Sequence, residues 1–356
     1  MSTQTVINQT RVEAFMGKVL ADTSGMAVTI MASIGDRLGL FGCLTDGPVT
    51  STQLAARAHV NERYTYEWLA SMTSAGYLEH DPASGYFTLP AEHAPILAQE
   101  NGPLFFGGLH QMLEGMSGQY QNVLQAFQQG GGVPQFAYSD DTWTGLERFT
   151  ASWFENLLIP VWIPAMPVVR AKLEQGAEVA DVGCGRGRAL IKLAQAYPNA
   201  HYVGYDNFEP TIAQATANAQ RAGVADRVRF RYLDASSGLP GTYDVITTFD
   251  VVHDAVNPHK LVRSIRQALR PDGRYVCVEV NCSDKLEENA GPLGALLYSI
   301  SILYCMTTSL SQGGEGLGTV GLPEAKFRKL CAEAGFTATR RVPLENPFSS
   351  LYEITP

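Results

Sequence analysis

Basic residues and long apolar runs are both scarce in this sequence. Of its 356 residues 17% are charged, and the formal net charge is −9. Broad binding to nucleic acid or to an anionic membrane surface requires basic patches, so the composition argues against both partners. No run of about 18 or more apolar residues occurs, and we therefore expect no segment that spans a membrane. The hydrophobic share of 45% is typical of a globular protein with a sizeable core.

Paired cysteines and a signal segment are missing as well. The N-terminal stretch MSTQTVINQTRVEAF lacks the basic and then apolar pattern of a secretory signal. The six cysteines are scattered without a C-x-x-C pair, which predicts reduced thiols and a cytoplasmic location. No H-x-x-x-H spacing occurs, and the carboxylates near residue 250 are too few to indicate magnesium. We therefore predict no metal site.

The pattern along the chain changes twice, and a chain of this length is expected to hold more than one domain. Residues 1–98 contain a helix, a turn, a longer helix and two short strands around an Asp-Pro-Ala-Ser-Gly turn, an order typical of a winged helix. In the longer helix four large side chains recur at helical spacing and are expected to face one core: Tyr64, Trp68, Leu69 and Met72. Residues 99–176 are mostly helical and rich in aromatic side chains.

From residue 177 to residue 356 strands alternate with helices. The expected strands are 178–182, 201–206, 228–234, 243–249, 274–280, 337–344 and 349–355. Alternation of this kind predicts an α/β domain with a parallel sheet that is covered by helices on both faces. The last two strands are joined by the short ENPF connection, which leaves no room for a crossover helix, so we expect these two strands to pair antiparallel.

A glycine-rich loop connects the first of these strands to the helix that follows it. Gly183, Gly185 and Gly187 alternate in the stretch VADVGCGRGRALIKLA, where glycine allows positive φ and lets the backbone approach a ligand closely. A dinucleotide-binding fingerprint requires G-x-G-x-x-G, and a P-loop ends in Gly-Lys-Ser or Gly-Lys-Thr. The loop here is G-x-G-x-G followed by Arg188. This pattern argues against both phosphate-binding interpretations but excludes neither.

Three carboxylates near the loop narrow the choice of ligand. Asp206 ends the second strand, where it can accept hydrogen bonds from both ribose hydroxyls of an adenosine. Asp234 ends the third strand, and its carboxylate together with the amide of Ala235 can reach the edge of an adenine. Asp181 precedes the glycines and suits a cationic amino-acid group better than a pyrophosphate, which it would repel. NAD and S-adenosylmethionine sites share the ribose-binding acid, so Asp206 alone does not discriminate between them.

Five linked motifs in this half resemble those of the class I S-adenosylmethionine-dependent methyltransferases: VADVGCGRG, YVGYD, FRYLDAS, YDVITTFDVVHD and LRPDGRYVCVEV. The resemblance covers about residues 177–356 and implies a Rossmann-like domain of seven strands, with S-adenosylmethionine as cofactor and S-adenosylhomocysteine as product. It implies that the cofactor is lined by Gly183, Cys184 through its backbone, Gly185 and Gly187, with Asp181 before the loop, Asp206 and Asn207 at the ribose, Asp234 and Ala235 at the adenine, and Phe249 and Asp250 on the far side.

Residues 1–98 are similar, in order and pattern more than in motif, to the dimerisation domain of small-molecule O-methyltransferases. In that group the N-terminal helices exchange between subunits, and linking helices cap the substrate pocket. The resemblance therefore implies a homodimer formed through the N-terminal helices, and a helical linker over residues 99–176 that caps the active site.

His253 is the candidate catalytic base. It follows the fourth strand, at the end where ligands bind in open α/β sheets, and an imidazole there can take the proton of a phenol near neutral pH. In plant-type O-methyltransferases a His-Asp or His-Asn pair at this position carries the base, and here Asp254 follows His253. That pattern continues with a tryptophan and an acid, whereas this chain has Ala255 and Val256. The alternative, a histidine that only packs beside the cofactor, therefore stays open.

The stretch 281–320 interrupts the alternation of strands and helices. Its apolar part, Leu293–Met306, is expected to be too short to cross a bilayer, so it is either a core helix or a wall of the substrate pocket. Together these features predict methyl transfer to a small, largely apolar or aromatic molecule, on oxygen. Two alternatives remain: N- or C-methylation of a small metabolite, and a DNA-binding regulator that uses the winged helix. Glu62 and Glu67 in the candidate recognition helix argue against the regulator, because they would face phosphates.

Overall fold

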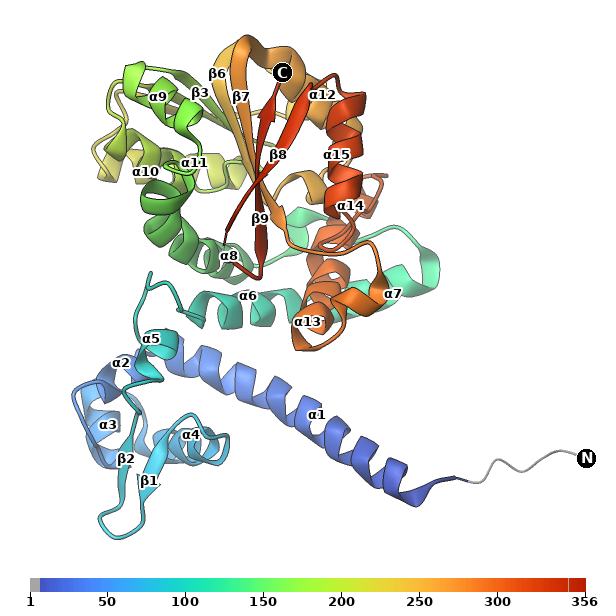
Figure 1. Ribbon diagram of the computed structural model, residues 1–356. Helices are drawn as coiled ribbons and strands as arrows, with labels where there is room; N and C mark the ends of the chain where they lie inside the picture. The colour runs from blue at the N-terminus through green and yellow to red at the C-terminus, as the bar shows by residue number, and fades with distance from the viewer. Residues whose placement is uncertain (1–6, 345) are drawn as a thin grey trace, which may run out of the picture. The chain divides into compact units, whose positions relative to one another are not determined.

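The computed structural model describes residues 7–344 and 346–356, and the chain divides into two compact units, Met1–Glu114 and Gly115–Pro356. Residues 1–6 of the expected winged-helix domain, and Glu345 of the ENPF connection, lie outside the described residues. Figure 1 shows the order of the elements in each unit. The division of the chain at residues 98 and 176 stays a prediction.

The first unit holds helices and one small hairpin around a common core. Its elements are α1 (Gln9–Arg37), α2 (Leu40–Leu44), α3 (Ser51–Ala58), α4 (Glu62–Ser74), β1 (Glu79–Asp81), β2 (Tyr86–Thr88) and α5 (Ala94–Leu97). Thr50 begins α3 with a capping box, and the Asn61 side chain accepts hydrogen bonds from two amides at the start of α4. These caps fix where the two helices begin, so helix, helix and hairpin form the expected winged-helix order.

One expectation about the core of this unit is wrong. Tyr64 is 81% exposed, whereas Trp68, Leu69 and Met72 are buried as predicted. The buried position one turn before Leu69 is Thr65, because the inward face of α4 is offset by one residue from the aromatic spacing in the sequence.

Most of α1 carries its apolar side chains on the surface of the unit. Phe15, Met16, Leu20 and Met26 are each more than 60% exposed. Burial begins only near the C-terminal end of the helix, where Ala32 belongs to the core formed with α2 and α4. A helix with this many exposed large apolar residues has an apolar surface that its own unit does not cover.

The second unit is built on a mixed sheet of seven strands. These are β3 (Glu178–Val182), β4 (His201–Asp206), β5 (Val228–Tyr232), β6 (Tyr243–Phe249), β7 (Leu269–Val280), β8 (Ala338–Val342) and β9 (Ser349–Thr355), in the order β5-β4-β3-β6-β7-β9-β8. The strands β5, β4, β3, β6 and β7 pair in parallel, and β9 pairs antiparallel with both β7 and β8. The predicted seven strands and the predicted antiparallel pairing at the C-terminal end are therefore confirmed.

Helices cover both faces of this sheet (Figure 1). One face packs against α9 (Pro167–Gln175), α10 (Arg188–Ala196) and α11 (Glu209–Arg221), and the other against α12 (Pro258–Ala268) and α15 (Glu324–Glu333). The order of the strands reverses at β3, because β4 lies on one side of it and β6 on the other. A reversal of this kind opens a crevice at the carboxyl ends of the strands, where open α/β sheets bind ligands.

Further helices precede the sheet along the chain. They are α6 (Gly107–Ser117), α7 (Tyr120–Gln129), η1 (Gln135–Ala137), α8 (Asp140–Trp153) and the π-helical η2 (Phe154–Trp162). Phe154 and Trp162 of η2 are buried in the core against α9 and α10, so these two aromatic residues serve packing. The remaining short turns are η3 (Ala235–Ser237), η4 (Val252–Asp254) and η5 (Leu286–Asn289).

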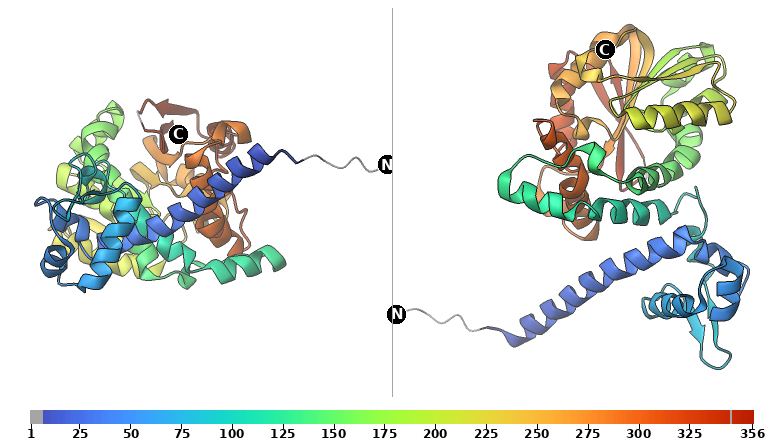
Figure 2. Two further views of the ribbon diagram at one scale, coloured as in Figure 1. Left: turned by 90° about the horizontal axis from the view of Figure 1, so that it is seen from below. Right: turned by 180° about the vertical axis from the view of Figure 1, so that it is seen from behind.

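The apolar stretch after β7 forms a longer helix than the sequence predicts. The segments α13 (Pro292–Ile300), η6 (Ser301–Cys305) and α14 (Met306–Ser311) run on as one helix of 20 residues, long and apolar enough by length and composition to cross a membrane. The expectation of a span too short for a bilayer is therefore wrong. Such a helix is weak support for a membrane span, because 44% of its apolar window is buried in the protein and core helices pass the same test. The η6 part of this helix lies beside α7 (Figure 2).

Candidate active site

The glycine loop runs from the end of β3 to the start of α10. Gly183, Gly185 and Gly187 have φ values of 71°, 51° and 82°, a region that side chains other than glycine rarely adopt. A Cβ atom at Gly183 would lie 2.5 Å from Val251, and one at Gly187 would lie 2.4 Å from Phe230. A Cβ atom at Gly185 would meet nothing within 4 Å. Two of the glycines are therefore needed for packing, and the third turns its backbone toward open space.

Asp206 holds this loop from the end of β4. Its Oδ2 atom accepts a hydrogen bond from the amide of Gly185 at 2.9 Å, and its Oδ1 atom accepts one from the amide of Phe208 at 2.9 Å. Burial raises the pKa of this carboxyl above its ordinary value. Asn207 lies exposed in the turn between Asp206 and Phe208. The carboxylate thus fixes the loop on one side and retains lone pairs for a further donor.

Asp181 lies beneath the loop, inside the sheet. Its Oδ1 atom accepts a hydrogen bond of 2.6 Å from the hydroxyl of Thr247 on the neighbouring strand β6, and only 2% of the residue is exposed. Burial raises its pKa to about 7, and the nearby charge of Asp206 adds to the rise. Two buried carboxylates at one edge of the sheet form a region that a cationic group would stabilise.

The other predicted cofactor residues lie along the same edge. Cys184 is buried, its amide donates to the carbonyl of Tyr205 at 3.0 Å, and its thiol packs inward, so the backbone is the part that faces the loop. Asp234 begins η3, where its side chain accepts from the amide of Ser236 at 2.9 Å, and Ala235 is buried behind it. The hydrogen bond from Leu233 N–H to the Asp206 carbonyl brings this turn next to β4.

Phe249 and Asp250 end the fourth strand, β6, and behave differently from each other. Phe249 points into the core, with its ring centroid 5.2 Å from that of Phe154 and 6.0 Å from that of Trp162. Asp250 has φ of 56°, which is uncommon for a residue other than glycine and is typical of functional sites. Its Oδ1 atom is buried without a hydrogen-bond partner in the described part of the chain, and burial raises its pKa to about 7.

His253 is held by a carboxylate at each ring nitrogen. Its Nδ1 atom lies 2.6 Å from Oε2 of Glu279, and its Nε2 atom lies 3.2 Å from Oδ1 of Asp254. The Val252 amide donates to the other oxygen of Glu279 at 2.8 Å, which fixes that carboxylate relative to η4. Burial alone would lower the pKa of His253, but the charges of Asp254 and Glu279 outweigh it, and the pKa lies well above its ordinary value.

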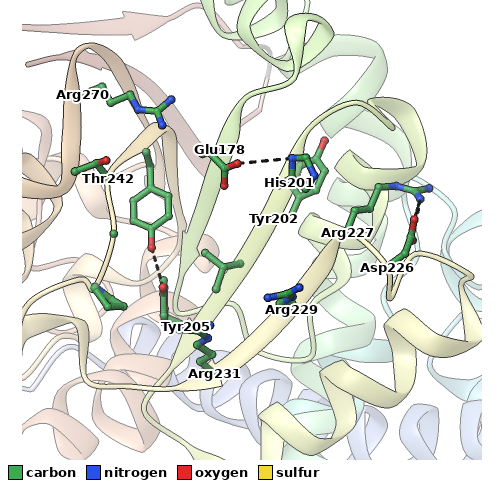
Figure 3. A pocket seen from close by; sticks show the side chains of 14 residues that line it. Glu178, His201, Tyr202, Tyr205, Asp226, Arg227, Arg229, Arg231, Thr242 and Arg270 are labelled. Carbon is green, nitrogen blue, oxygen red and sulfur yellow. Dashed lines mark hydrogen bonds and ion pairs between the residues drawn. The ribbon is translucent and has the colours of Figure 1, made fainter.

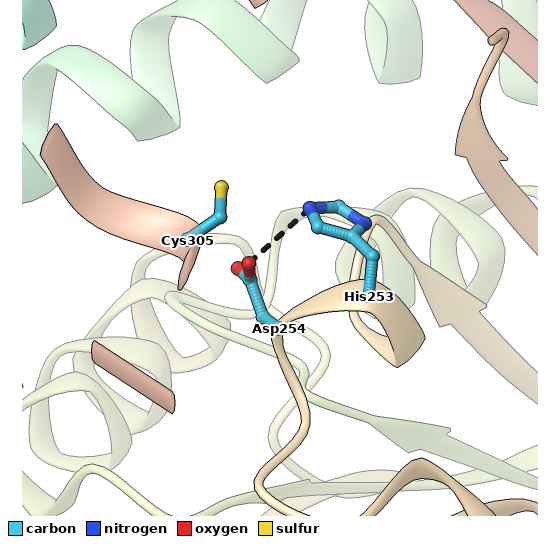
Figure 4. Close-up of side chains that lie close together, drawn as sticks. All are labelled: His253, Asp254 and Cys305. Atoms are coloured by element: carbon cyan, nitrogen blue, oxygen red, sulfur yellow. Dashed lines mark ion pairs between the residues drawn. The ribbon is translucent and has the colours of Figure 1, made fainter. Parts of the chain in front are cut away.

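Two residues of this cluster were not predicted. Glu279 stands in the apolar strand β7 and is 2% exposed, and Cys305 comes from the π-helical segment η6. The side chains of His253, Asp254 and Cys305 converge (Figure 4). The sequence YVCVEV carries a signal for Glu279, because a carboxylate inside a buried strand requires a partner. Nothing in the spacing of Cys305 could place it beside His253.

Aromatic side chains stand beside the ribose-side turn. The ring centroid of Trp143 in α8 lies 4.8 Å from that of Phe208 and 5.7 Å from that of Tyr304, and Tyr138 lies 5.2 Å from Tyr304. The amide of Gln135 donates to the hydroxyl of Tyr304 at 3.3 Å. Tyr304 is in the apolar helix after β7, so that helix contributes to this aromatic cluster as well as to the core.

Ion pairs tie α8 to the glycine loop. Arg186, the residue between the last two glycines, contacts Asp140 at 2.6 Å and Glu147 at 3.2 Å. Arg188 contacts Glu147 at 3.4 Å and Glu155 at 3.0 Å. These arginines are engaged with carboxylates of α8 and η2, which makes them poor candidates for binding a phosphate.

A second hollow lies on the sheet beside β4 and β5, and it reaches from the first residues of β3, β4 and β6 to Tyr205 and Arg231 near the carboxyl ends of β4 and β5 (Figure 3). It has a volume of about 520 Å³. Glu178 pairs with His201 at 3.7 Å and Asp226 with Arg227 at 2.9 Å, while Arg229 and Arg231 form no ion pair among the described residues. None of the predicted site residues lies here.

Comparison with known families decides what the second unit is. Residues 173–310 match the model of a methyltransferase domain, and residues 26–99 match that of an Rv2258c-like winged HTH domain. The second unit therefore contains a methyltransferase domain, and the first contains a winged HTH domain. The predicted fold, a seven-stranded methyltransferase domain preceded by a winged helix, is confirmed by these matches and by the strand order.

Individual relatives of this methyltransferase act on small molecules. O-demethylpuromycin-O-methyltransferase of Streptomyces alboniger is 30% identical over 182 residues, which are 50% of this chain and 45% of that protein. The 27-O-demethylrifamycin SV methyltransferase of Amycolatopsis mediterranei is 32% identical over 105 residues, 29% of this chain and 38% of that protein. The chain thus spans less than half of the length of the curated relatives that it matches.

Solved structures match over nearly the whole methyltransferase. That of a mitomycin 7-O-methyltransferase has a TM-score of 0.70 at 18% identity and covers 98% of this chain and 99% of its own. That of human N-acetylserotonin methyltransferase, determined with S-adenosylmethionine, has a TM-score of 0.67 at 17% identity and covers 99% of both chains. At these identities the likeness shows the fold alone.

Proposed function

We propose that this methyltransferase transfers the methyl group of S-adenosylmethionine to an oxygen atom of a small, largely apolar or aromatic molecule. The observation that carries the proposal is the oriented His253–Glu279 pair at the carboxyl edge of the sheet, close to the glycine loop. A hydroxyl acceptor must lose a proton during transfer, and a positioned imidazole is the group most often used for that step.

The residues around the crevice suit the cofactor. The exposed backbone of Gly185 and the remaining lone pairs of Asp206 fit an adenosine ribose, with Asn207 beside it, and the η3 turn with Asp234 fits an adenine edge. The buried carboxylates of Asp181 and Asp206 fit a cationic amino-acid group. When bound, S-adenosylmethionine supplies an activated methyl group, so the protein has to align the acceptor and accept its proton.

In its neutral form His253 would accept that proton at Nε2, and because its pKa is raised this form becomes more populated as the pH rises. Glu279 accepts the Nδ1–H hydrogen bond, which fixes the tautomer and the orientation of the ring. In the structure Nε2 contacts Asp254, so an acceptor hydroxyl would take the place of that carboxylate at Nε2. Asp254 would then lie beside the acceptor and hold the histidine in its charged form after proton transfer.

The class of acceptor follows from the aromatic cluster and from the relatives. Trp143, Tyr138 and Tyr304 provide flat apolar surfaces beside the cofactor-side turn, and such rings favour aromatic ligands and a neighbouring positive charge. Two of the proteins named above, O-demethylpuromycin-O-methyltransferase and the mitomycin 7-O-methyltransferase, are O-methyltransferases by their names. Both observations support a small acceptor that is methylated on oxygen.

The exposed apolar face of α1 supports the further proposal that the enzyme is a homodimer in which these helices pair. Phe15, Met16 and Leu20 would lose most of their exposed area on pairing, and burial of such side chains stabilises an interface. We place the enzyme in the cytoplasm, because the cysteines of the described residues are all free.

Calorimetry with S-adenosylmethionine and S-adenosylhomocysteine, followed by turnover of a panel of small phenols, alcohols, amines and carbon acids, tests the function. We expect both nucleosides to bind, and mass spectrometry of the products to show a methyl ether. A methylated amine or carbon would replace O-methylation by one of the alternatives. Binding of a nicotinamide nucleotide without S-adenosylmethionine binding would overturn the proposal.

A further inference from the structure

We propose that His253, Asp254 and Cys305 form a binding site for a zinc-type divalent cation. The donor atoms of these three side chains, a ring nitrogen, a carboxylate oxygen and a thiol sulfur, all lie within 4.8 Å of one another. His253 and Cys305 are buried, and the Nε2–Oδ1 distance of 3.2 Å is close to the separation of two ligands on one tetrahedral ion. The three side chains point to a common space (Figure 4).

Glu279 supports His253 as a metal ligand. A histidine that binds a metal through one ring nitrogen almost always donates the other N–H to a carboxylate or carbonyl, which fixes the ring. Nδ1 of His253 lies 2.6 Å from Glu279, so the free lone pair of a neutral ring is on Nε2, the atom that faces Asp254 and Cys305. The histidine therefore already has the orientation and the partner of a ligand.

The charges around His253 also favour a divalent cation. The carboxylates of Asp250, Asp254 and Glu279 surround one imidazole, and donor atoms of Asp250, His253 and Glu279 form a second group within 4.8 Å. Oδ1 of Asp250 is buried without a hydrogen-bond partner among the described residues, and Oδ1 of Asp254 is buried beside Nε2 of His253. A divalent ion would neutralise carboxylates that now share a single histidine.

The mixture of donor atoms selects the ion. Calcium and magnesium prefer oxygen ligands only, whereas zinc takes imidazole, thiolate and carboxylate together. Three protein ligands leave a fourth position for a small molecule, as in zinc sites that bind water or substrate. Cys305 belongs to the π-helical turn η6, and such turns occur often at functional sites.

Zinc and an active base exclude each other at His253. An ion on Nε2 occupies the lone pair that would accept the acceptor's proton, so zinc would inhibit methyl transfer and a chelator would restore it. This consequence rests on the proposed function, but the binding site itself does not. A metal-binding measurement therefore separates a failure of the site from a failure of the proposed reaction.

Titration of the full-length protein with Co²⁺, a spectroscopic substitute for zinc, tests the site. We expect one Co²⁺ per chain with a thiolate-to-cobalt charge-transfer band, and displacement of the cobalt by zinc. Cys305→Ser should lose the band, and Cys331→Ser, which alters a buried thiol on the core side of α15, should keep it. A band that persists in Cys305→Ser, or cobalt binding without any such band, would overturn the proposal.

A second variant keeps the test decisive if Cys305→Ser does not fold. Glu279→Gln retains the shape of the side chain and removes its charge, and loss of such a supporting carboxylate typically lowers metal affinity about 10- to 100-fold. We expect zinc affinity to fall by that factor in equilibrium dialysis, with S-adenosylhomocysteine affinity unchanged as the control for folding. Unchanged zinc affinity in Glu279→Gln contradicts the proposed site.

Discussion

Two regions of the same sheet, the carboxyl ends of β3, β6 and β7 and the hollow beside β4 and β5, are built in opposite ways. At the carboxyl edge, Asp181, His253 and Glu279 are each no more than 3% exposed, so their charges are held by specific partners inside the protein. In the hollow, Arg229 and Arg231 are exposed and have no ion-pair partner among the described residues. Charges that are removed from water cost stability unless they are paired, whereas exposed charges on an outermost strand such as β5 cost little and oppose pairing with another sheet.

This difference indicates where the chain gives up stability for function. Buried carboxylates in excess of their cationic partners, together with the unusual backbone of Asp250, occur only at the carboxyl edge within the described residues. A ligand that brings positive charge, such as a sulfonium or an ammonium group, would stabilise this edge. Among the described residues, those that line the hollow show no comparable strain. Variants in the two regions should therefore differ sharply in their effects on activity.

Replacing His253 with alanine should have the largest effect. Loss of a general base typically slows the chemical step about 100-fold or more, so we expect kcat to fall by at least that factor. Affinity for S-adenosylhomocysteine, measured by calorimetry, should change little. Turnover equal to that of the natural protein would leave His253 as a packing residue. It would also remove the main functional contrast between the carboxyl edge and the hollow.

The glycine loop allows a matched pair of substitutions, Gly185→Ala and Gly187→Ala. Both positions have positive φ, so both variants are strained by about 1 kcal/mol or more. At Gly187 the new methyl group would also clash with Phe230, and overpacking of this kind adds about 1–3 kcal/mol of destabilisation. At Gly185 the methyl group would point into the space that we assign to the cofactor.

One variant should therefore mainly lower stability, and the other should mainly lower cofactor affinity. Gly187→Ala should lower the free energy of unfolding in urea more than Gly185→Ala does. Gly185→Ala should weaken S-adenosylmethionine binding about 10-fold or more relative to its small loss of stability, a difference of about 1.4 kcal/mol. Equal cofactor affinity in Gly185→Ala and the natural protein would contradict the placement of the cofactor at this loop.

The buried carboxyl group of Asp181 should make the free energy of unfolding depend on pH, and we expect this effect to be of intermediate size. Its pKa is raised from 3.8 to about 7 in the folded state, so the folded protein holds a proton that the unfolded chain has lost over this range. The contribution of Asp181 to the free energy of unfolding is therefore fully present below pH 3.8 and is lost as the pH rises toward about 7. Asp181→Asn should flatten that part of the stability curve, as measured by urea unfolding at several pH values. A wild-type curve that Asp181→Asn leaves unchanged would show that this carboxylate is already charged.

The sequence predicted the frame of the site better than its interior. Strand and helix alternation placed the seven strands, and the glycines and terminal acids lie at the expected edge, because parallel strands end at one edge and the loops that follow them meet there. Phe249 was expected on the far side of the cofactor; its ring packs against Phe154 and Trp162, and its place beside the cofactor stays a prediction. Successive side chains of a strand point to opposite faces of the sheet, and the motif alone does not show which face Phe249 is on.

Contacts across long stretches of chain could not be predicted in the same way. Cys305 reaches His253 only because a π-helical turn shifts the buried face of the apolar helix. Regular helical spacing places Tyr298, Ile302, Cys305 and Met306 near one face of this stretch, whereas the buried residues there include Ser301, Tyr304 and Cys305. A π-helical turn has no residue signature of its own, so helical periodicity assigns the wrong face after it.

The smallest effect is expected in the hollow beside β4 and β5. Replacing both Arg229 and Arg231 with alanine removes two exposed charges from the hollow in Figure 3, and surface charges of this kind contribute only about 0–1 kcal/mol to stability. We expect kcat, S-adenosylmethionine affinity and zinc affinity each to stay within about twofold of the natural protein. The same assays that register His253→Ala serve as the measurement, so the double variant is its matched control. A tenfold loss of turnover in the arginine variant would mean that the hollow takes part in catalysis, and the contrast between the two regions would fail.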